Sequence, residues 1–267
     1  MRAMTTGQLT GFSPLIAQPC IAVLVGAGIS KGLGFRLMGG DDFEPLFSEF
    51  RDHLKEDRCD GILDHVELPD RERPNLEDVF EQITQISASA ATLRNCANGC
   101  RLAEWATRAD KMIGRFVAER YAFPEDKEFA TRVYTEALDA LWPGTYGNVL
   151  PIFTINYDLA LESFWLANRD SYKLIRVLET SALHQVDSSN SRQIVLMKLH
   201  GSTGWTFEEN PQHEARVVTI PLETPSLLGA VQEHAIVVPV RNKAPQREPF
   251  LTYFAYLLSL AEYGDKA

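Results

Sequence analysis

Three short groups of glycine and polar residues have the types and spacing that could support chemistry. The first group is Gly26-Ala27-Gly28-Ile29-Ser30, which directly follows the apolar run Ile21 to Val25. Two glycines separated by one residue leave the backbone uncovered, so a pyrophosphate could approach it and bind the N–H groups of a following helix. The strict dinucleotide-binding pattern has a third glycine where this chain has Lys31, with Gly32 one position later. The group predicts a phosphate site, and a plain tight turn between a strand and a helix is the alternative.

The second and third groups supply an amide, a carboxylate and an imidazole. Asn156 and Asp158 follow the apolar run Leu150 to Ile155, and His200 follows the run Ile194 to Leu199. A helix-like sequence begins after Asp158, so this carboxylate could simply cap that helix. Capping explains Asn156 less well, because a polar amide directly after a buried strand must find hydrogen-bond partners. An imidazole has a pKa of about 6.5 and can act as a base near neutral pH, but a structural role for His200 stays open.

Short apolar runs could position these groups. The runs have the length and composition of buried parallel strands. Ligands of open parallel sheets bind beyond the carboxyl ends of the strands, which is where the three groups stand. The runs are Ile21 to Val25, Leu150 to Ile155, Leu174 to Leu178, Ile194 to Leu199 and Ile236 to Val240.

A long helical segment separates the first two runs. Asn75 is the expected N-cap of one helix, with Asp78 three residues later. Three apolar stripes at helical spacing are expected to face the core. The stripes are Leu76, Val79, Phe80, Ile83 and Ile86; Leu102, Trp105, Ala109, Met112, Ile113, Phe116 and Val117; and Phe129, Val133, Ala137, Leu138 and Leu141, which ends before Pro143-Gly144.

The alternation of strands and helices predicts an α/β fold. We expect a Rossmann-type parallel sheet flanked by helices, with a large helical insertion after the first strand. Residues 1–40 and 145–267 would form the sheet domain, and residues 41–144 an acidic helical insertion module.

The charge of the chain is concentrated in one segment. The 267 residues carry a net charge of −10, and the segment from Asp41 to Glu81 holds 15 acidic and 5 basic residues. This segment would repel the phosphates of nucleic acid, so direct nucleic-acid binding is not expected. It forms either a solvated helical face or a docking surface for a basic partner.

The cysteines and the hydropathy pattern favour the reducing cytoplasm. Cys20, Cys59, Cys96 and Cys100 are too few and too scattered for a disulfide framework. Cys96 and Cys100 have helical spacing rather than the spacing of a zinc knuckle. The N-terminus has no signal-peptide core, and no apolar run approaches the roughly 20 residues needed to cross a bilayer. We expect a cytoplasmic protein without a membrane partner.

Taken in order, the three groups resemble the sirtuin motifs. They are Gly26 to Ser30, Thr154 to Asp158 and His200-Gly201, within a resemblance that spans roughly residues 20–240. The forms Asn156-Tyr157-Asp158 and Leu199-His200-Gly201-Ser202, with Trp205, are more similar to the bacterial sirtuin-like NAD hydrolases of anti-phage defence than to protein deacylases.

Two departures from the deacylases shape this resemblance. Deacylases hold a structural zinc with two CxxC pairs after the catalytic histidine, whereas no cysteine follows Cys100 here. No zinc or other metal is therefore expected. The segment Gly32 to Arg36 is only loosely similar to the sirtuin cofactor loop, so no ligand role is assigned to Phe35 and Arg36.

The resemblance implies an NAD glycohydrolase that cleaves NAD, its substrate, to nicotinamide and ADP-ribose as the toxic effector of an anti-phage system. A protein partner or a homo-oligomer would control its activity. The alternatives are an NAD-dependent deacylase without zinc, and a module that senses NAD or ADP-ribose without turning it over. Gly26, Ala27, Gly28 and Ser30 would hold the phosphates, Asn156 would position water and a ribose hydroxyl, His200 would be the general base, and Asp158 would orient the nicotinamide carboxamide.

The end of the chain carries one further expectation. The apolar-rich stretch Phe250 to Leu260 lies just before Ala267. A doubly wound fold would continue into another strand there, so we expect a fragment of a longer protein, or a chain without the elements that contact the adenosine half of NAD.

Overall fold

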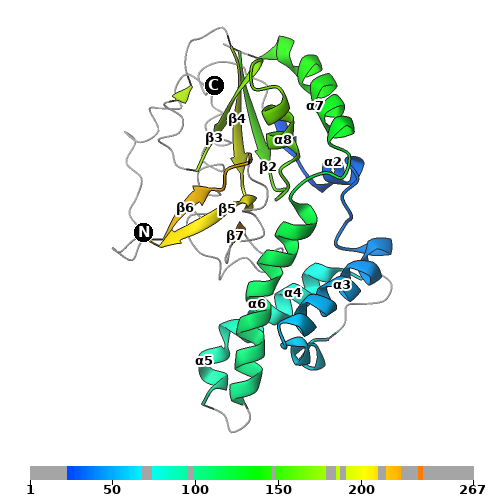
Figure 1. The fold of residues 1–267 in the computed structure, drawn as a ribbon, viewed down its shortest axis with the longest axis vertical. Helices are drawn as coiled ribbons and strands as arrows, with labels where there is room; N and C mark the ends of the chain where they lie inside the picture. Colours follow the sequence, from blue (N-terminus) through cyan, green and yellow to red (C-terminus); the bar gives the residue numbers. More distant parts are fainter. Residues whose placement is uncertain are drawn as a thin grey trace, which may run out of the picture.

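A four-stranded parallel sheet forms one half of the molecule (Figure 1). The computed structural model describes residues 23–67, 74–95, 99–145, 148–178, 185–186, 191–209, 215–223 and 234–236. The strand order is β1-β2-β4-β3, and all three pairings are parallel. The expected α/β fold of Rossmann type is therefore confirmed. Its strands are β1 (Val23–Val25), β2 (Val149–Thr154), β3 (Tyr172–Arg176) and β4 (Arg192–Lys198).

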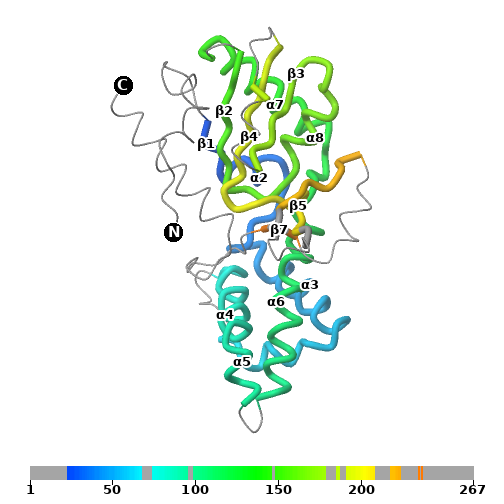
Figure 2. The backbone as a smooth tube through the Cα atoms, turned by 90° about the vertical axis from the view of Figure 1, so that its left-hand side faces the viewer, coloured from blue at the N-terminus to red at the C-terminus, as the bar shows by residue number. Residues whose placement is uncertain are grey.

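Helices α7 (Lys127–Leu141) and α8 (Ala160–Ala167) lie beside this sheet (Figures 1 and 2). Tyr134 of α7 contacts Phe164 of α8, with ring centroids 5.9 Å apart. The indole of Trp165 donates a hydrogen bond to the carbonyl oxygen of Tyr172 in β3. Of the third predicted stripe, Leu138 is buried and Phe129, Val133 and Leu141 are partly buried against the core, although the sequence division places α7 within the helical insertion.

The other half of the molecule is a helical unit, residues 43–121, that extends away from the sheet (Figures 1 and 2). Phe50, Phe80 and Phe116 meet at its centre in edge-to-face pairs, with ring centroids 5.0 to 6.3 Å apart. Its elements are α3 (Phe43–Glu56), the 3-10 turn η4 (Asp60–His65), α4 (Leu76–Ala88), α5 (Ala90–Leu93) and α6 (Gly99–Tyr121).

The two halves share one hydrophobic core. Helix α6 contacts α4 in the helical unit and strand β5 (Gly201–Glu209) near the sheet. Asn75 caps α4 as expected, since its side chain accepts a hydrogen bond from the Glu77 N–H. One continuous cluster of buried side chains runs from Phe50 and Ile83 to Ile152 and Phe164. This continuity joins the insertion to the sheet as a single packed body.

A small antiparallel sheet follows the main one and corrects the sequence prediction. Strand β5 (Gly201–Glu209) lies between β6 (Ala215–Thr219) and β7 (His234–Ile236). The apolar run 236–240 was expected to form another parallel strand, but Ile236 pairs antiparallel with Gly201 of β5. An apolar run indicates burial and says nothing of pairing direction. Residues 237–267, including Phe250 to Leu260, lie outside the described residues.

Three short elements complete the described chain. They are helix α2 (Ala27–Gly32), directly after β1, and the 3-10 turns η3 (Gly40–Asp42) and η5 (Trp142–Gly144). In the described residues, no helix is long and apolar enough to span a bilayer.

Two glycines of the helical unit test its packing. A Cβ added to Gly61 would lie 2.5 Å from the ring of Trp105, whereas a Cβ added to Gly114 within α6 meets nothing within 4 Å. We expect Gly61→Ala to lower the free energy of unfolding by about 1–3 kcal/mol through overpacking. The matched variant Gly114→Ala should raise it by about 0.5–1 kcal/mol, because alanine favours a helix interior. Urea unfolding measures both, and equal effects would contradict this packing.

Candidate functional site

The three sequence groups follow three strands that end level with one another in the parallel sheet. Val25 pairs with Thr154, and Thr154 pairs with Lys198, so β1, β2 and β4 end side by side. The Leu199 N–H donates to the Thr154 carbonyl oxygen over 2.8 Å, which continues the ladder one step further. This register brings segments from residues 26, 156 and 200 to the same edge.

The turn after β4 carries His200 and depends on the glycine that follows it. Gly201 has a φ of +78°, in the left-handed region that side chains with a Cβ rarely adopt. This conformation lets the chain leave the parallel sheet and enter β5 within two residues. The ring of His200 stands 6.2 Å from the ring of Tyr157, centroid to centroid.

The amide of Asn156 joins the first and second groups. Its Nδ2 donates to the Gly26 carbonyl oxygen over 3.1 Å and to Ser30 Oγ over 2.8 Å. A carbonyl oxygen can only accept, so this bond fixes which end of the amide is the nitrogen. Among the described residues, no donor contacts Asn156 Oδ1. That oxygen is therefore the side-chain atom that can accept a hydrogen bond from a ligand.

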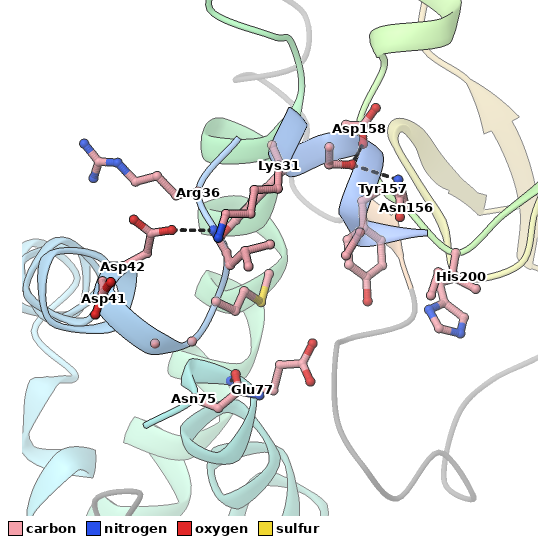
Figure 3. Close-up of a pocket in the computed structure, with 18 residues that line it drawn as sticks. Lys31, Arg36, Asp41, Asp42, Asn75, Glu77, Asn156, Tyr157, Asp158 and His200 are labelled. Carbon is pink, nitrogen blue, oxygen red and sulfur yellow. Dashed lines mark hydrogen bonds between the residues drawn. The ribbon is translucent and has the colours of Figure 1, made fainter. Parts of the chain in front are cut away.

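Asp158 lies beneath this junction and is 8% exposed. Ser30 Oγ donates to Asp158 Oδ2 over 2.7 Å, and the Ala160 N–H donates to Oδ1 over 3.1 Å. The carboxylate therefore assists the start of α8, whose N-cap is Leu159, one residue later than the sequence suggested. It also points toward Ser30 and away from His200 (Figure 3).

Strand β1 ends at Val25 and α2 begins at Ala27, so the glycine turn between them is a single residue, Gly26. Gly26 has a φ of −125° and Gly28 lies within α2, so neither uses the freedom of a positive φ. The plain tight turn between a strand and a helix therefore stays an alternative to a phosphate site. A Cβ at either position meets no described atom within 4 Å. Among the described residues nothing covers these two positions, so a phosphate group could approach the backbone N–H groups there.

A cavity of about 810 Å³ opens at this sheet edge (Figure 3). This volume lies within the range of small-molecule sites, about 300–1,000 Å³. Of the candidate residues, Ala27, Ser30, Asn156, Asp158 and His200 line it. Gly26 and Gly28 are not among the lining residues, although the Gly26 carbonyl binds Asn156 at the cavity edge.

The opposite wall of the cavity comes from the helical half, which the sequence analysis did not anticipate. Asn75 and Glu77, at the start of α4, face the strand ends across the cavity (Figure 3). Backbone hydrogen bonds hold this wall: the Gly40 N–H donates to the Pro74 carbonyl oxygen and the Leu76 N–H to the Met38 carbonyl oxygen. Lys31, Arg36, Leu37, Met38, Gly39, Gly40, Asp41, Asp42 and Tyr121 also contribute to the lining.

The segment 32–36 divides between core and cavity. Phe35 is buried and stacks on Tyr121, with ring centroids 6.4 Å apart. Arg36 lines the cavity and forms an ion pair with Glu49 over 3.0 Å. A sequence pattern could not separate these neighbours, because their opposite directions depend on α6 and α3.

Tyr157, on the strand side of the cavity, interacts electrostatically with Glu77 on the opposite wall. Burial, and then the carboxylate of Glu77, raise the pKa of its phenol above the ordinary range. The phenol is therefore neutral at physiological pH and remains a hydrogen-bond donor. In Figure 3 its hydroxyl points into the space between Glu77 and His200.

The described parts of the chain contain no group of three or more His, Cys, Asp or Glu residues that could hold a metal ion. Cys59 is buried and Cys100 is exposed, and neither forms a disulfide, while Cys20 and Cys96 lie outside the described residues. No protein-family model matches the chain, and no curated protein is significantly similar to it in sequence.

The Ser30 hydroxyl tests the link between the first two groups. We expect Ser30→Ala to lower the free energy of unfolding by about 1–3 kcal/mol, because Asp158 Oδ2 loses its donor while remaining buried. Ser163→Ala is the matched control, since no described partner bonds the buried Ser163 hydroxyl. Urea unfolding of both variants decides the matter, and equal losses would show that the Ser30 bond contributes nothing specific.

Proposed function

We propose that this chain is an NAD glycohydrolase that converts NAD and water to nicotinamide and ADP-ribose. The observation that supports this proposal most is that Asn156, His200 and two residues of the first group, Ala27 and Ser30, line one cavity. The order of the three motifs and their resemblance to the sirtuin-like hydrolases agree with it.

The walls of the cavity suit the two ends of NAD. Lys31 and Arg36 lie on one side, where a diphosphate would find cations beside the uncovered backbone of α2 (Figure 3). Glu77 lies nearer His200, and its carboxylate favours the cationic nicotinamide and the positive charge that develops on the ribose. Both carboxylate oxygens of Asp158 accept hydrogen bonds within the protein, and the carboxylate points away from His200 (Figure 3). Its part in this proposal is therefore to hold Ser30 and the start of α8 rather than to orient the carboxamide.

The reaction breaks the bond between the ribose anomeric carbon and the nicotinamide nitrogen. Nicotinamide leaves as a neutral molecule with the electron pair of that bond, so the leaving group needs no acid. A water molecule attacks the anomeric carbon and loses a proton to His200. Asn156 Oδ1 accepts a hydrogen bond from that water or from a ribose hydroxyl, which orients the attack.

We further propose that the enzyme acts in the cytoplasm as the toxic effector of a bacterial anti-phage system. A protein partner or self-association would then control it. The acidic segment Asp41 to Glu81 supports control by a partner, because some of its residues line the cavity while others carry exposed carboxylates that a basic partner could contact.

Substitution of the two proposed catalytic residues gives the first test. We expect His200→Ala to reduce nicotinamide release from NAD by about 10²–10⁴-fold, the usual value of general-base catalysis. Asn156→Ala should reduce it by roughly 100-fold through lost orientation of the attack. Circular dichroism should stay unchanged in both variants. His65→Ala is the control, because His65 is exposed and lies outside the cavity. Wild-type turnover in His200→Ala would contradict the proposed role of His200 as the general base.

A second measurement separates the enzyme classes. Purified protein is incubated with NAD alone and with NAD plus an acylated peptide, and nicotinamide is followed by chromatography. We expect release without the peptide. Release only with the peptide would favour a deacylase, and binding of NAD without release, also in cell extract that supplies a partner, would favour a sensor.

A further inference from the structure

A buried ion pair lies directly below the candidate site. Lys198, the last residue of β4, and Glu162, in α8, are each 1% exposed and approach to 2.9 Å. The pair is enclosed by the sheet and α8, and the proposed reaction makes no use of it.

The ammonium group of Lys198 connects the two loops that carry the proposed catalytic residues. It donates to the carbonyl oxygen of Asp158, two residues after Asn156. It also donates to Ser202 Oγ over 3.2 Å, two residues after His200. With Glu162, these contacts use all three N–H donors of the ammonium.

Stability alone does not explain this arrangement. Two charges lose their hydration on burial, and well-packed apolar side chains of similar size often stabilise a fold as well or better. Glu162 Oε2 also has no hydrogen-bond partner among the described residues. What an apolar pair could not provide is the directional bond from one ammonium to both loops.

A second set of contacts keeps the loops joined without Lys198. The N–H and the hydroxyl of Thr203 both donate to the Tyr157 carbonyl oxygen, over 3.0 and 3.1 Å. A small cavity of about 20 Å³ beside Lys198, Glu162, Asp158 and Asn156 gives these side chains room to shift. Loss of Lys198 would therefore loosen the site while the fold persists.

We propose that Lys198, held by Glu162, is a positioning residue that fixes the placement of His200 relative to Asn156. The effect on the reaction rate that we expect from this role rests on the proposed function. A displacement of about 1 Å between reacting groups can cost roughly 100-fold in rate.

The test replaces the pair by apolar side chains of similar size. Lys198→Met alone leaves the Glu162 carboxylate buried without its partner, so we expect a lower Tm. The double variant Lys198→Met/Glu162→Leu should regain a Tm close to the wild type. Its kcat for nicotinamide release should stay at least about tenfold below the wild type, with KM changed less than about threefold.

Leu54→Ala is the matched control for lost stability. Leu54 is fully buried in α3 and lies outside the cavity, so its truncation should lower Tm without changing kcat below the unfolding temperature. If the double variant does not fold, Ser202→Ala removes the Lys198 bond on the His200 side, together with the bond from the Gly204 N–H, and should lower kcat in the same way.

A spectroscopic measurement makes the inference independent of turnover. The ring of His200 lies beside that of Tyr157, with centroids 6.2 Å apart, so the His200 NMR signal reports their relative position. In ¹³C-histidine-labelled protein, with the signal assigned through His200→Gln, the resonance should move in Lys198→Met, in the double variant and in Ser202→Ala, and stay unchanged in Leu54→Ala.

The outcomes separate the two proposals. A folded double variant with wild-type kcat, or with an unmoved His200 resonance, would overturn the positioning role. A wild-type protein that releases no nicotinamide, with or without a cell extract, would overturn the proposed function. The resonance alone would then decide the role of Lys198.

Discussion

The alignment of Val25, Thr154 and Lys198 across three parallel strands is the constraint on which the site depends. Parallel strands end at the same sheet edge, so the residues that follow them are brought together whatever their distance in sequence. Asn156 then bonds a carbonyl 130 residues earlier in the chain, and Ser30 reaches Asp158 across 128 residues. A shift of one residue in either pairing would turn these side chains to the other face of the sheet.

The polar groups below the cavity form a layer that fixes its shape. Ser30 accepts from Asn156 and donates to Asp158, and Lys198 reaches the Asp158 backbone, Ser202 and Glu162. Buried polar groups of this kind are costly unless each finds a partner, so their bonds hold the loops in one arrangement. Above this layer, Asn156 and His200 line the cavity.

The helical insertion contributes to the site as well as to the fold. It shares a continuous core with the sheet, and the start of α4 forms the wall opposite the strand ends. The segment before η3 approaches the segment before α4 so closely that a Cβ added to Gly39 would lie 2.9 Å from the Pro74 carbonyl oxygen. Any change in how the insertion packs would therefore alter the width of the cavity, which gives a protein partner or a second copy a physical route to the site.

The sequence by itself determined the parallel strands, the apolar stripes of the helices, the Asn75 cap and the groups that stand at the strand ends. These features follow from local spacing, from the period of side-chain burial and from the chemistry of single residues. Only the tertiary structure decided the contacts between distant segments: the direction of β7, the place of α7 beside the sheet, the wall formed by Asn75 and Glu77, and the pairing of Lys198 with Glu162. Such partners are chosen by packing and by the need to satisfy buried charge, which no local pattern records.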